Sequence, residues 1–354
     1  MDIFEKYSVP SALDGVSTVE EWYKKREELK KLIYLEYGNP LPVPESVCFK
    51  EERSINEFAS KATVRKGSVC AVVNGKEIEF PVKEVVPSGE GKHPVIVLLN
   101  FHADVPDKYF PAEEVIDRGY AAVSINYNDV TTDDNDFTTG IAPCFIQGER
   151  KPDDPGKIMM WAWAAMRVAD CLEKESWADT DRLAVIGHSR LGKTALLTGA
   201  LDERFAFIHS NNAGCCGDAL FRVGIHSEKA EHIKNITDVF PYWFCPSFKE
   251  YADNEDKLPF DQHFLLSLIA PRRVNVASAI LDQWACPEAQ FACCKAASPV
   301  YEFLGRDGFI AGKSLPEPGT HFQDGEIGFH LRSGSHYLSR EDWNLFMDFM
   351  DKKQ

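Results

Sequence analysis

The chain has 354 residues, of which 44% are hydrophobic and 12% aromatic, and a chain of that size and composition can bury a large core. Its formal net charge is −16, from 55 acidic and 39 basic residues. This balance argues against nucleic acid or an anionic membrane as the main partner, because both need a basic surface. The sequence contains no run of about 18 apolar residues, so we expect no membrane span. The first residues carry no basic segment followed by an apolar one, which predicts a cytoplasmic protein, or a secreted one if a leader has been removed.

The ten cysteines include two adjacent pairs, Cys215-Cys216 and Cys293-Cys294, and none has the C-x-x-C spacing of a zinc site. With no export signal, the thiols are expected to be mostly reduced. We therefore expect no metal site and no cofactor.

The beginning of the chain differs in pattern from the rest. Residues 19–37 place apolar side chains among many charges, which predicts an amphipathic helix that ends at Gly38-Asn39-Pro40. Residues 41–44 are proline-rich and read as a connector. Residues 1–60 are therefore predicted to be a helical extension packed on a catalytic domain of residues 61–354.

From residue 62 onward strands and helices alternate. Residues 68–73 and 76–82 are predicted to form a hairpin around Asn74-Gly75. The continuous apolar run at 94–101 is typical of a strand buried on both faces of a parallel sheet. Further strands are expected at 120–127, 182–187, 205–210, 273–279 and 327–332, and helices at 107–118, 156–175, 191–200, 288–304 and 341–351. This alternation predicts an α/β-hydrolase fold, a doubly wound, mostly parallel sheet sandwiched by helices, with active groups on loops after the strands.

One connection in this series is unusually long. Residues 128–155 are acidic and rich in turn-forming residues, so we expect a surface insertion. Its aspartates Asp133, Asp134 and Asp136 are interpreted as solvated loop carboxylates.

A strand–turn–helix motif surrounds Ser189, in the run Gly187-His188-Ser189-Arg190-Leu191-Gly192-Lys193. The serine lies at the apex, as in a nucleophile elbow, and the helix N-terminus points at it. The elbow usually reads G-x-S-x-G, whereas here the second glycine comes one place later and an arginine follows the serine. Taken alone, the stretch is also compatible with an anion-binding turn or a tight connection.

Two later loops hold the residues that a serine nucleophile needs. In the α/β-hydrolase fold an acid follows the serine in the chain, and a histidine follows the acid. Strand 273–279 leads into Asp282, and strand 327–332 leads into His336. We expect Ser189 to be the nucleophile, His336 its general base, and Asp282 the group that fixes the histidine tautomer. The histidines His102, His188 and His263 are interpreted as packing or loop-orienting residues.

These motifs resemble those of the glucuronoyl esterases, carbohydrate esterase family 15. The run from Gly187 to Lys193 is similar to the family's G-x-S-R-x-G-K elbow. The resemblance covers roughly residues 62–350 and includes further stretches at Asn100-Phe101, 211–215, 258–263, 268–272, Asp282-Gln283-Trp284 and Gly334-Ser335-His336.

The resemblance implies a metal-independent serine esterase that acts on esters of glucuronate or 4-O-methyl-glucuronate in plant cell-wall glucuronoxylan. It implies that Arg190 helps form the oxyanion hole, that Lys193 binds sugar hydroxyls and that Trp284 lines the uronate pocket. A cation beside a developing oxyanion is favourable, and Lys193 lies one helical turn after Ser189. Without the resemblance, Lys193 reads as a solvated helix lysine and Trp284 as a core aromatic.

The sequence departs from the family at two points. Some members carry a glutamate acid after the strand that follows the elbow helix, where this chain has Asn211-Asn212. That leaves Asp282 as the acid, with Glu288 and Asp218 as weaker substitutes. The residue before the serine, often small, is His188 here, and the sequence gives it no role.

The expected partner is a small-molecule or oligosaccharide uronate ester, and the oligomeric state is left open. Two alternatives to a uronate-directed esterase remain at this point. One is an acetyl (xylan) esterase on the same scaffold, and the other is a binding module that no longer turns substrate over.

Overall fold

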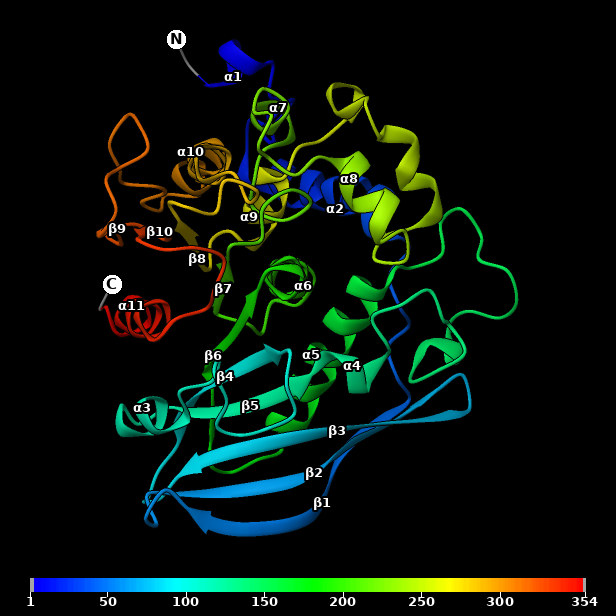
Figure 1. The fold of residues 1–354 in the computed structure, drawn as a ribbon, viewed down its shortest axis with the longest axis vertical. Helices are drawn as coiled ribbons and strands as arrows, with labels where there is room; N and C mark the ends of the chain where they lie inside the picture. The colour runs from blue at the N-terminus through cyan, green and yellow to red at the C-terminus, as the bar shows by residue number, and fades with distance from the viewer. Residues whose placement is uncertain (1–2, 353–354) are drawn as a thin grey trace.

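The computed structural model describes residues 3–352, and a ten-stranded mixed sheet runs through the described chain (Figure 1). Its strand order is β1-β2-β3-β5-β4-β6-β7-β8-β10-β9. The strands are β1 (Ser46–Glu57), β2 (Ala62–Val73), β3 (Lys76–Pro87), β4 (His93–Asn100), β5 (Ala121–Asn126), β6 (Ala178–His188), β7 (Phe207–Asn211), β8 (Arg273–Ala279), β9 (Thr320–Phe322) and β10 (Ile327–Arg332). The helices are α1 (Ile3–Tyr7), α2 (Val19–Tyr37), α3 (Ala112–Asp117), α4 (Tyr127–Val130), η1 (Ala142–Cys144), α5 (Lys157–Leu172), α6 (Arg190–Leu201), α7 (Phe221–Gly224), α8 (Ile233–Val239), η2 (Pro246–Tyr251), η3 (Glu255–Lys257), α9 (His263–Ile269), α10 (Pro287–Phe303) and α11 (Arg340–Asp351).

The strands from β5 to β10 in the sheet order run parallel to one another, whereas β1, β2, β3 and β9 pair antiparallel at the two edges. Helices cover both faces, with α3 and α11 on one side and α5 and α6 on the other (Figure 1). Alternate side chains of β4 enter two separate core clusters, Val97 and Leu99 in one and Ile96 and Leu98 in the other. A strand buried on both faces needs an apolar side chain at every position, which explains its continuous apolar run.

The N-terminal region is not only helical. Helix α2 begins and ends as predicted, and a capping box between Thr18 and Glu21 fixes its start. However, β1 pairs along its length with β2, so the predicted boundary after residue 60 cuts through a β-hairpin. Strand β1 was not predicted because it is an exposed edge strand rich in charged side chains, with little apolar alternation.

The centre of the sheet brings distant parts of the chain together. Strands β6, β7, β8 and β10 are consecutive parallel neighbours, so their carboxyl ends lie along one edge. Ser189 follows β6, Asn212 follows β7, Asp282 lies just beyond β8 and His336 lies just beyond β10. Within residues 3–352, no helix combines the length and the apolar character that crossing a bilayer requires.

Candidate active site

The turn between β6 and α6 holds Ser189 in a strained conformation with a positive φ of 59° and a ψ of −128°. Such a backbone is costly for a serine and is typical of a nucleophile elbow, where it exposes the hydroxyl. A Cβ atom on Gly187 would lie 2.0 Å from the Leu191 carbonyl oxygen, so no larger residue fits there. A Cβ on Gly192 would lie 3.1 Å from both Ala213 Cβ and Ser210 Oγ. The displaced second glycine therefore lets α6 pack closely on the end of β7.

Arg190 is the first residue of α6, and amide groups in the first turn of a helix have no intrahelical acceptor. Its guanidinium lies 4.5 Å from the ring centre of Trp243 and is ion-paired with Asp133. Asp133 is itself held by Trp243 Nε1 at 2.7 Å and by the Tyr127 hydroxyl at 3.0 Å. The arginine side chain is thus held by Asp133 and Trp243, with its charge balanced by one carboxylate.

The interpretation of Asp133 as a solvated loop carboxylate is therefore wrong. Its side chain is only 12% exposed and lies against Arg190. The acidic composition of the loop does not indicate which aspartate turns inward. The position of Asp133 depends on Arg190 and Trp243, which lie 57 and 110 residues away in the chain.

The two later loops bring His336 and Asp282 into contact. His336 Nδ1 donates to Asp282 Oδ2 at 2.6 Å, and Asn212 Nδ2 donates to the same oxygen at 2.7 Å. Burial raises the pKa of Asp282, but the hydrogen bonds and charge from His336 and Asn212 outweigh it and bring the pKa below its usual value. Asp282 is therefore an anion, aimed at the imidazole nitrogen that does not face the substrate in a serine esterase.

The two substitute acids are placed differently. Asp218 is fully buried and accepts hydrogen bonds from Ser210 Oγ, Gln290 Nε2 and the Gly214 N–H, so its oxygens are engaged away from the histidine. Glu288 is exposed at the start of α10.

His188 has a position that explains its presence beside the serine. Its ring lies 4.4 Å, centre to centre, from that of His336, and its Nδ1 donates to Asn211 Oδ1 at 2.6 Å. Burial, followed by the nearby His336, lowers the pKa of His188 to about 3. His188 is therefore neutral, and its ring packs against that of His336 at an interplanar angle of 43°. His102 stacks on Tyr109 at 5.5 Å and His263 packs at the edge of Phe264.

Lys193 and Trp284 are linked by Glu231, a residue that was not predicted from the sequence. Lys193 is 3% exposed, and its Nζ donates to the carbonyls of Ala213 and Cys215 and lies 3.6 Å from Glu231 Oε2. The other carboxylate oxygen of Glu231 accepts from Trp284 Nε1 at 3.0 Å. Trp284 is 49% exposed. Lys193 is thus not a solvated lysine, and Trp284 is not a core aromatic.

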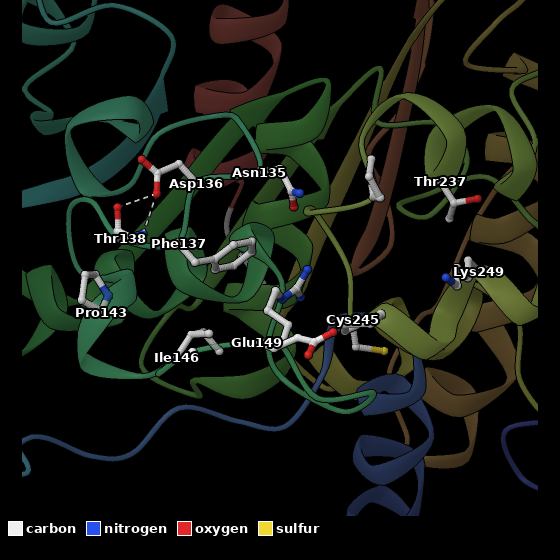
Figure 2. A pocket seen from close by; sticks show the side chains of 14 residues that line it. Asn135, Asp136, Phe137, Thr138, Pro143, Ile146, Glu149, Thr237, Cys245 and Lys249 are labelled. Carbon is white, nitrogen blue, oxygen red and sulfur yellow. Dashed lines mark hydrogen bonds between the residues drawn. The ribbon is translucent and has the colours of Figure 1, made fainter.

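A cavity of about 630 Å³ lies between two loop segments that come from distant parts of the chain (Figure 2). Asn135 and Phe137 line it from the loop that carries Asp133, and Thr237 and Cys245 line it from the segment that carries Trp243. Arg150 Nη2 donates to the Phe244 carbonyl at 2.8 Å and so joins the two segments. Among residues 3–352, no group of three or more His, Cys, Asp or Glu side chains is placed to hold a metal ion.

Comparison with known proteins identifies the family. A family model described as "Glucuronyl esterase, fungi" matches residues 69–305. The chain belongs to the glucuronoyl esterase family. Carbohydrate esterase MZ0003, from an unknown prokaryotic organism, is 31% identical in an alignment that covers 98% of this chain and 89% of that relative. The 4-O-methyl-glucuronoyl methylesterase of Podospora anserina is 29% identical over 298 residues, which cover 82% of this chain and 58% of that relative.

Solved structures of glucuronoyl esterases have the same fold. A promiscuous esterase of carbohydrate esterase family 15 from a marine bacterial metagenome superimposes with a TM-score of 0.87 at 30% identity, covering 97% of this chain and 96% of that one. The glucuronoyl esterase from Solibacter usitatus also gives a TM-score of 0.87, at 29% identity and 97% coverage of both chains. The expected family, the α/β-hydrolase fold and the assignment as a carboxylic ester hydrolase are confirmed.

Proposed function

We propose that this glucuronoyl esterase family member hydrolyses esters of glucuronate or 4-O-methyl-glucuronate through an acyl-enzyme on Ser189. The observation that carries the proposal is the polar cluster of Lys193, Glu231 and Trp284, which begins one helical turn after the nucleophile. The names of relatives such as the Podospora anserina methylesterase support the same substrate class.

The proposed reaction uses the arrangement at the ends of β6, β8 and β10. His336 takes the hydroxyl proton of Ser189 as the oxygen attacks the ester carbonyl, and later gives that proton to the departing alcohol. Asp282, hydrogen-bonded to His336 Nδ1 at 2.6 Å, stabilises the imidazolium. The Arg190 N–H and guanidinium stabilise the oxyanion. Water then attacks the carbonyl of the acyl-enzyme. His336 takes a proton from this water and gives it to the Ser189 oxygen as the free acid departs.

We propose that the cluster binds the sugar on the acyl side of the scissile bond. The Glu231 carboxylate accepts hydrogen bonds from hydroxyls, the Lys193 ammonium supplies positive charge, and the half-exposed Trp284 offers an apolar face for the ring. In a uronate ester the sugar belongs to the acyl group, whereas in an acetylated xylan the sugar belongs to the leaving alcohol. Polar groups that recognise the acyl-side sugar therefore favour a uronate ester over an acetyl ester.

A direct comparison of two substrates tests the function. We expect kcat/KM for methyl glucuronate to exceed that for an acetylated methyl xyloside by about 10²-fold or more, because a site built to hydrogen-bond hydroxyls discriminates against acyl groups that lack them. The measurement is initial-rate kinetics on both esters at one pH. Faster deacetylation would establish the acetyl esterase instead, and turnover of neither ester would favour the binding module.

Glu231→Gln tests the polar cluster of Lys193, Glu231 and Trp284 separately from the catalytic residues. It removes the carboxylate between Lys193 and Trp284, so we expect kcat/KM for methyl glucuronate to fall by about 10- to 100-fold, the effect of losing a charged hydrogen-bond partner. Hydrolysis of 4-nitrophenyl acetate, whose acyl group carries no sugar, should stay within about threefold of the original enzyme.

Glu228→Gln is the matched control, because this glutamate lies on the same loop and is exposed to solvent. It should leave both substrates unaffected. Equal losses on both esters in Glu231→Gln would mean that the glutamate supports the catalytic groups rather than the sugar.

A further inference from the structure

Arg332 is the last residue of β10 and directly precedes the loop that carries His336. Its side chain is 5% exposed. Nη2 donates to the Ser335 carbonyl at 3.0 Å and to the Tyr337 carbonyl, and Nη1 donates to the Ser333 carbonyl at 3.1 Å. One guanidinium group therefore holds the backbone on both sides of His336.

Asp342, in the first turn of α11, holds Arg332 in turn. Its two oxygens lie 3.1 and 3.0 Å from Arg332 Nε, and Oδ1 also accepts from His330 Nε2 at 2.9 Å. The N–H and hydroxyl of Ser339 both donate to Oδ2 at 2.7 Å. Asp342 is completely buried, and each of its oxygens accepts at least two hydrogen bonds, so it is a fixed anchor between β10 and α11.

The same loop is also tied to the loop that carries Asp282. The Ile280 N–H donates to the Arg332 carbonyl and the Leu281 N–H donates to the Gly334 carbonyl, both at 3.0 Å. Gly334 has φ +98°, and a Cβ there would lie 3.3 Å from Arg332 Nη1, so the glycine leaves room for the guanidinium. The position of His336 relative to Asp282 is thereby defined through backbone contacts.

We propose that Arg332, anchored by Asp342, is a positioning residue for His336. The inference rests on the proposed role of His336 as general base. Ser333 and Ser335 are exposed, and apart from the backbone contacts to Ile280 and Leu281 the loop is held by Tyr337, which packs on Tyr109 and donates to the Lys108 carbonyl. The clamp is the set of hydrogen bonds from the Arg332 guanidinium to the carbonyls of this loop, and its loss widens the range of conformations open to the backbone on both sides of His336. The clamp holds the imidazole against Asp282, and the Arg332 side chain contacts only backbone carbonyls and Asp342.

Arg332→Lys tests the clamp, because lysine keeps the charge but cannot bond three carbonyls and Asp342 together. We expect kcat to fall by about 10- to 100-fold, since a displacement of about 1 Å at a catalytic group has an effect of that order. KM should stay within about twofold, because the polar cluster of Lys193, Glu231 and Trp284 is untouched.

Arg273→Lys is the matched control. Arg273 is 7% exposed, pairs with Glu326 at 3.3 Å and lies 4.1 Å from the Phe349 ring of α11, so it too joins the sheet to α11. It begins β8, at the end of the strand away from Asp282. Both variants should lower Tm, but only Arg332→Lys should lower kcat.

Proton NMR of the His336 Nδ1–H resonance gives a readout that needs no substrate. The resonance that disappears in Asp282→Asn is assigned to the His336 Nδ1 proton, which is donated to the Asp282 carboxylate. We expect this resonance to move upfield or broaden in Arg332→Lys and to stay unchanged in Arg273→Lys. This readout, and kinetics on whichever ester the enzyme prefers, test the clamp even if the uronate preference fails.

A milder variant covers the case in which Arg332→Lys does not fold. Ser339→Ala removes the partly exposed hydroxyl that donates to Asp342 Oδ2 and accepts from the Asp342 N–H, and it should lower kcat by about threefold with KM unchanged. The proposal is overturned if the variants that fold keep the original kcat and the original His336 resonance. It is also overturned if Arg273→Lys loses as much kcat as Arg332→Lys.

Discussion

Ser189→Ala should reduce kcat on methyl glucuronate by about 10⁴- to 10⁶-fold, the range expected when the nucleophile of a serine hydrolase is removed. Alanine keeps the Cβ at the apex of the turn but offers no oxygen for the acyl-enzyme. The fold should persist, because Gly187 and Gly192 still allow the close approach of β6, α6 and the end of β7. Hydrolysis and the thermal transition, measured on the same sample, separate a chemical loss from unfolding.

Ser335→Ala is the control for this prediction. Ser335 is an exposed serine beside His336 in the chain, and its contact with Arg332 is made by the backbone carbonyl, which alanine retains. Its kcat should stay within about threefold of the original enzyme. Near-normal turnover in Ser189→Ala would place the nucleophile elsewhere.

Asp282→Asn has the second-largest expected effect, a fall in kcat of about 10³- to 10⁴-fold. The carboxylate accepts from His336 Nδ1 at 2.6 Å, which leaves Nε2 free to take the serine proton. An asparagine amide can donate to Nδ1 instead, and that hydrogen bond favours the tautomer with its proton on Nε2, where it cannot act as a base. The pKa of Asp282 is held below its usual value, so the original enzyme keeps this anion throughout the neutral range.

Glu288→Gln decides between the acids that the sequence left open. We expect it to leave kcat unchanged, because Glu288 is an exposed residue at the start of α10. If the loss appeared in Glu288→Gln and not in Asp282→Asn, the acid would have to be reassigned. Comparing pH profiles of kcat for both variants would show which one changes the titration of the histidine.

Local patterns in the chain are enough to predict the central architecture. The continuous apolar run of β4, the capped amphipathic pattern of α2 and the glycines around Ser189 are signals that neighbouring residues create together. These signals arise from backbone and burial requirements on residues close together in the chain, so they can be recognised from the sequence alone. The order of serine, acid and histidine then follows from which loops come after which strands.

The missing parts of the site have a different origin. Asp133 meets Arg190 across 57 residues, and Glu231 meets Trp284 across 53. Residues this far apart share no helix or strand, so hydrophobic periodicity carries no signal that they meet. The sequence pattern therefore does not distinguish these two carboxylates from solvent-exposed ones. The edge strand β1 was not predicted for a related reason. Its sequence shows little alternation of apolar and polar residues, and it is a strand because it pairs with β2.

The sequence by itself therefore determined the central strands of the sheet, the elbow and the loops on which Ser189, Asp282 and His336 lie, because strand burial and turn geometry constrain adjacent residues. Only the tertiary structure decided which charges pair around them: Asp133 with Arg190, Glu231 with Lys193, and Asp342 with Arg332. An ion pair depends on the distance between side chains and on their burial. Both are set by how β6, β10 and the intervening loops pack, and not by any spacing along the chain.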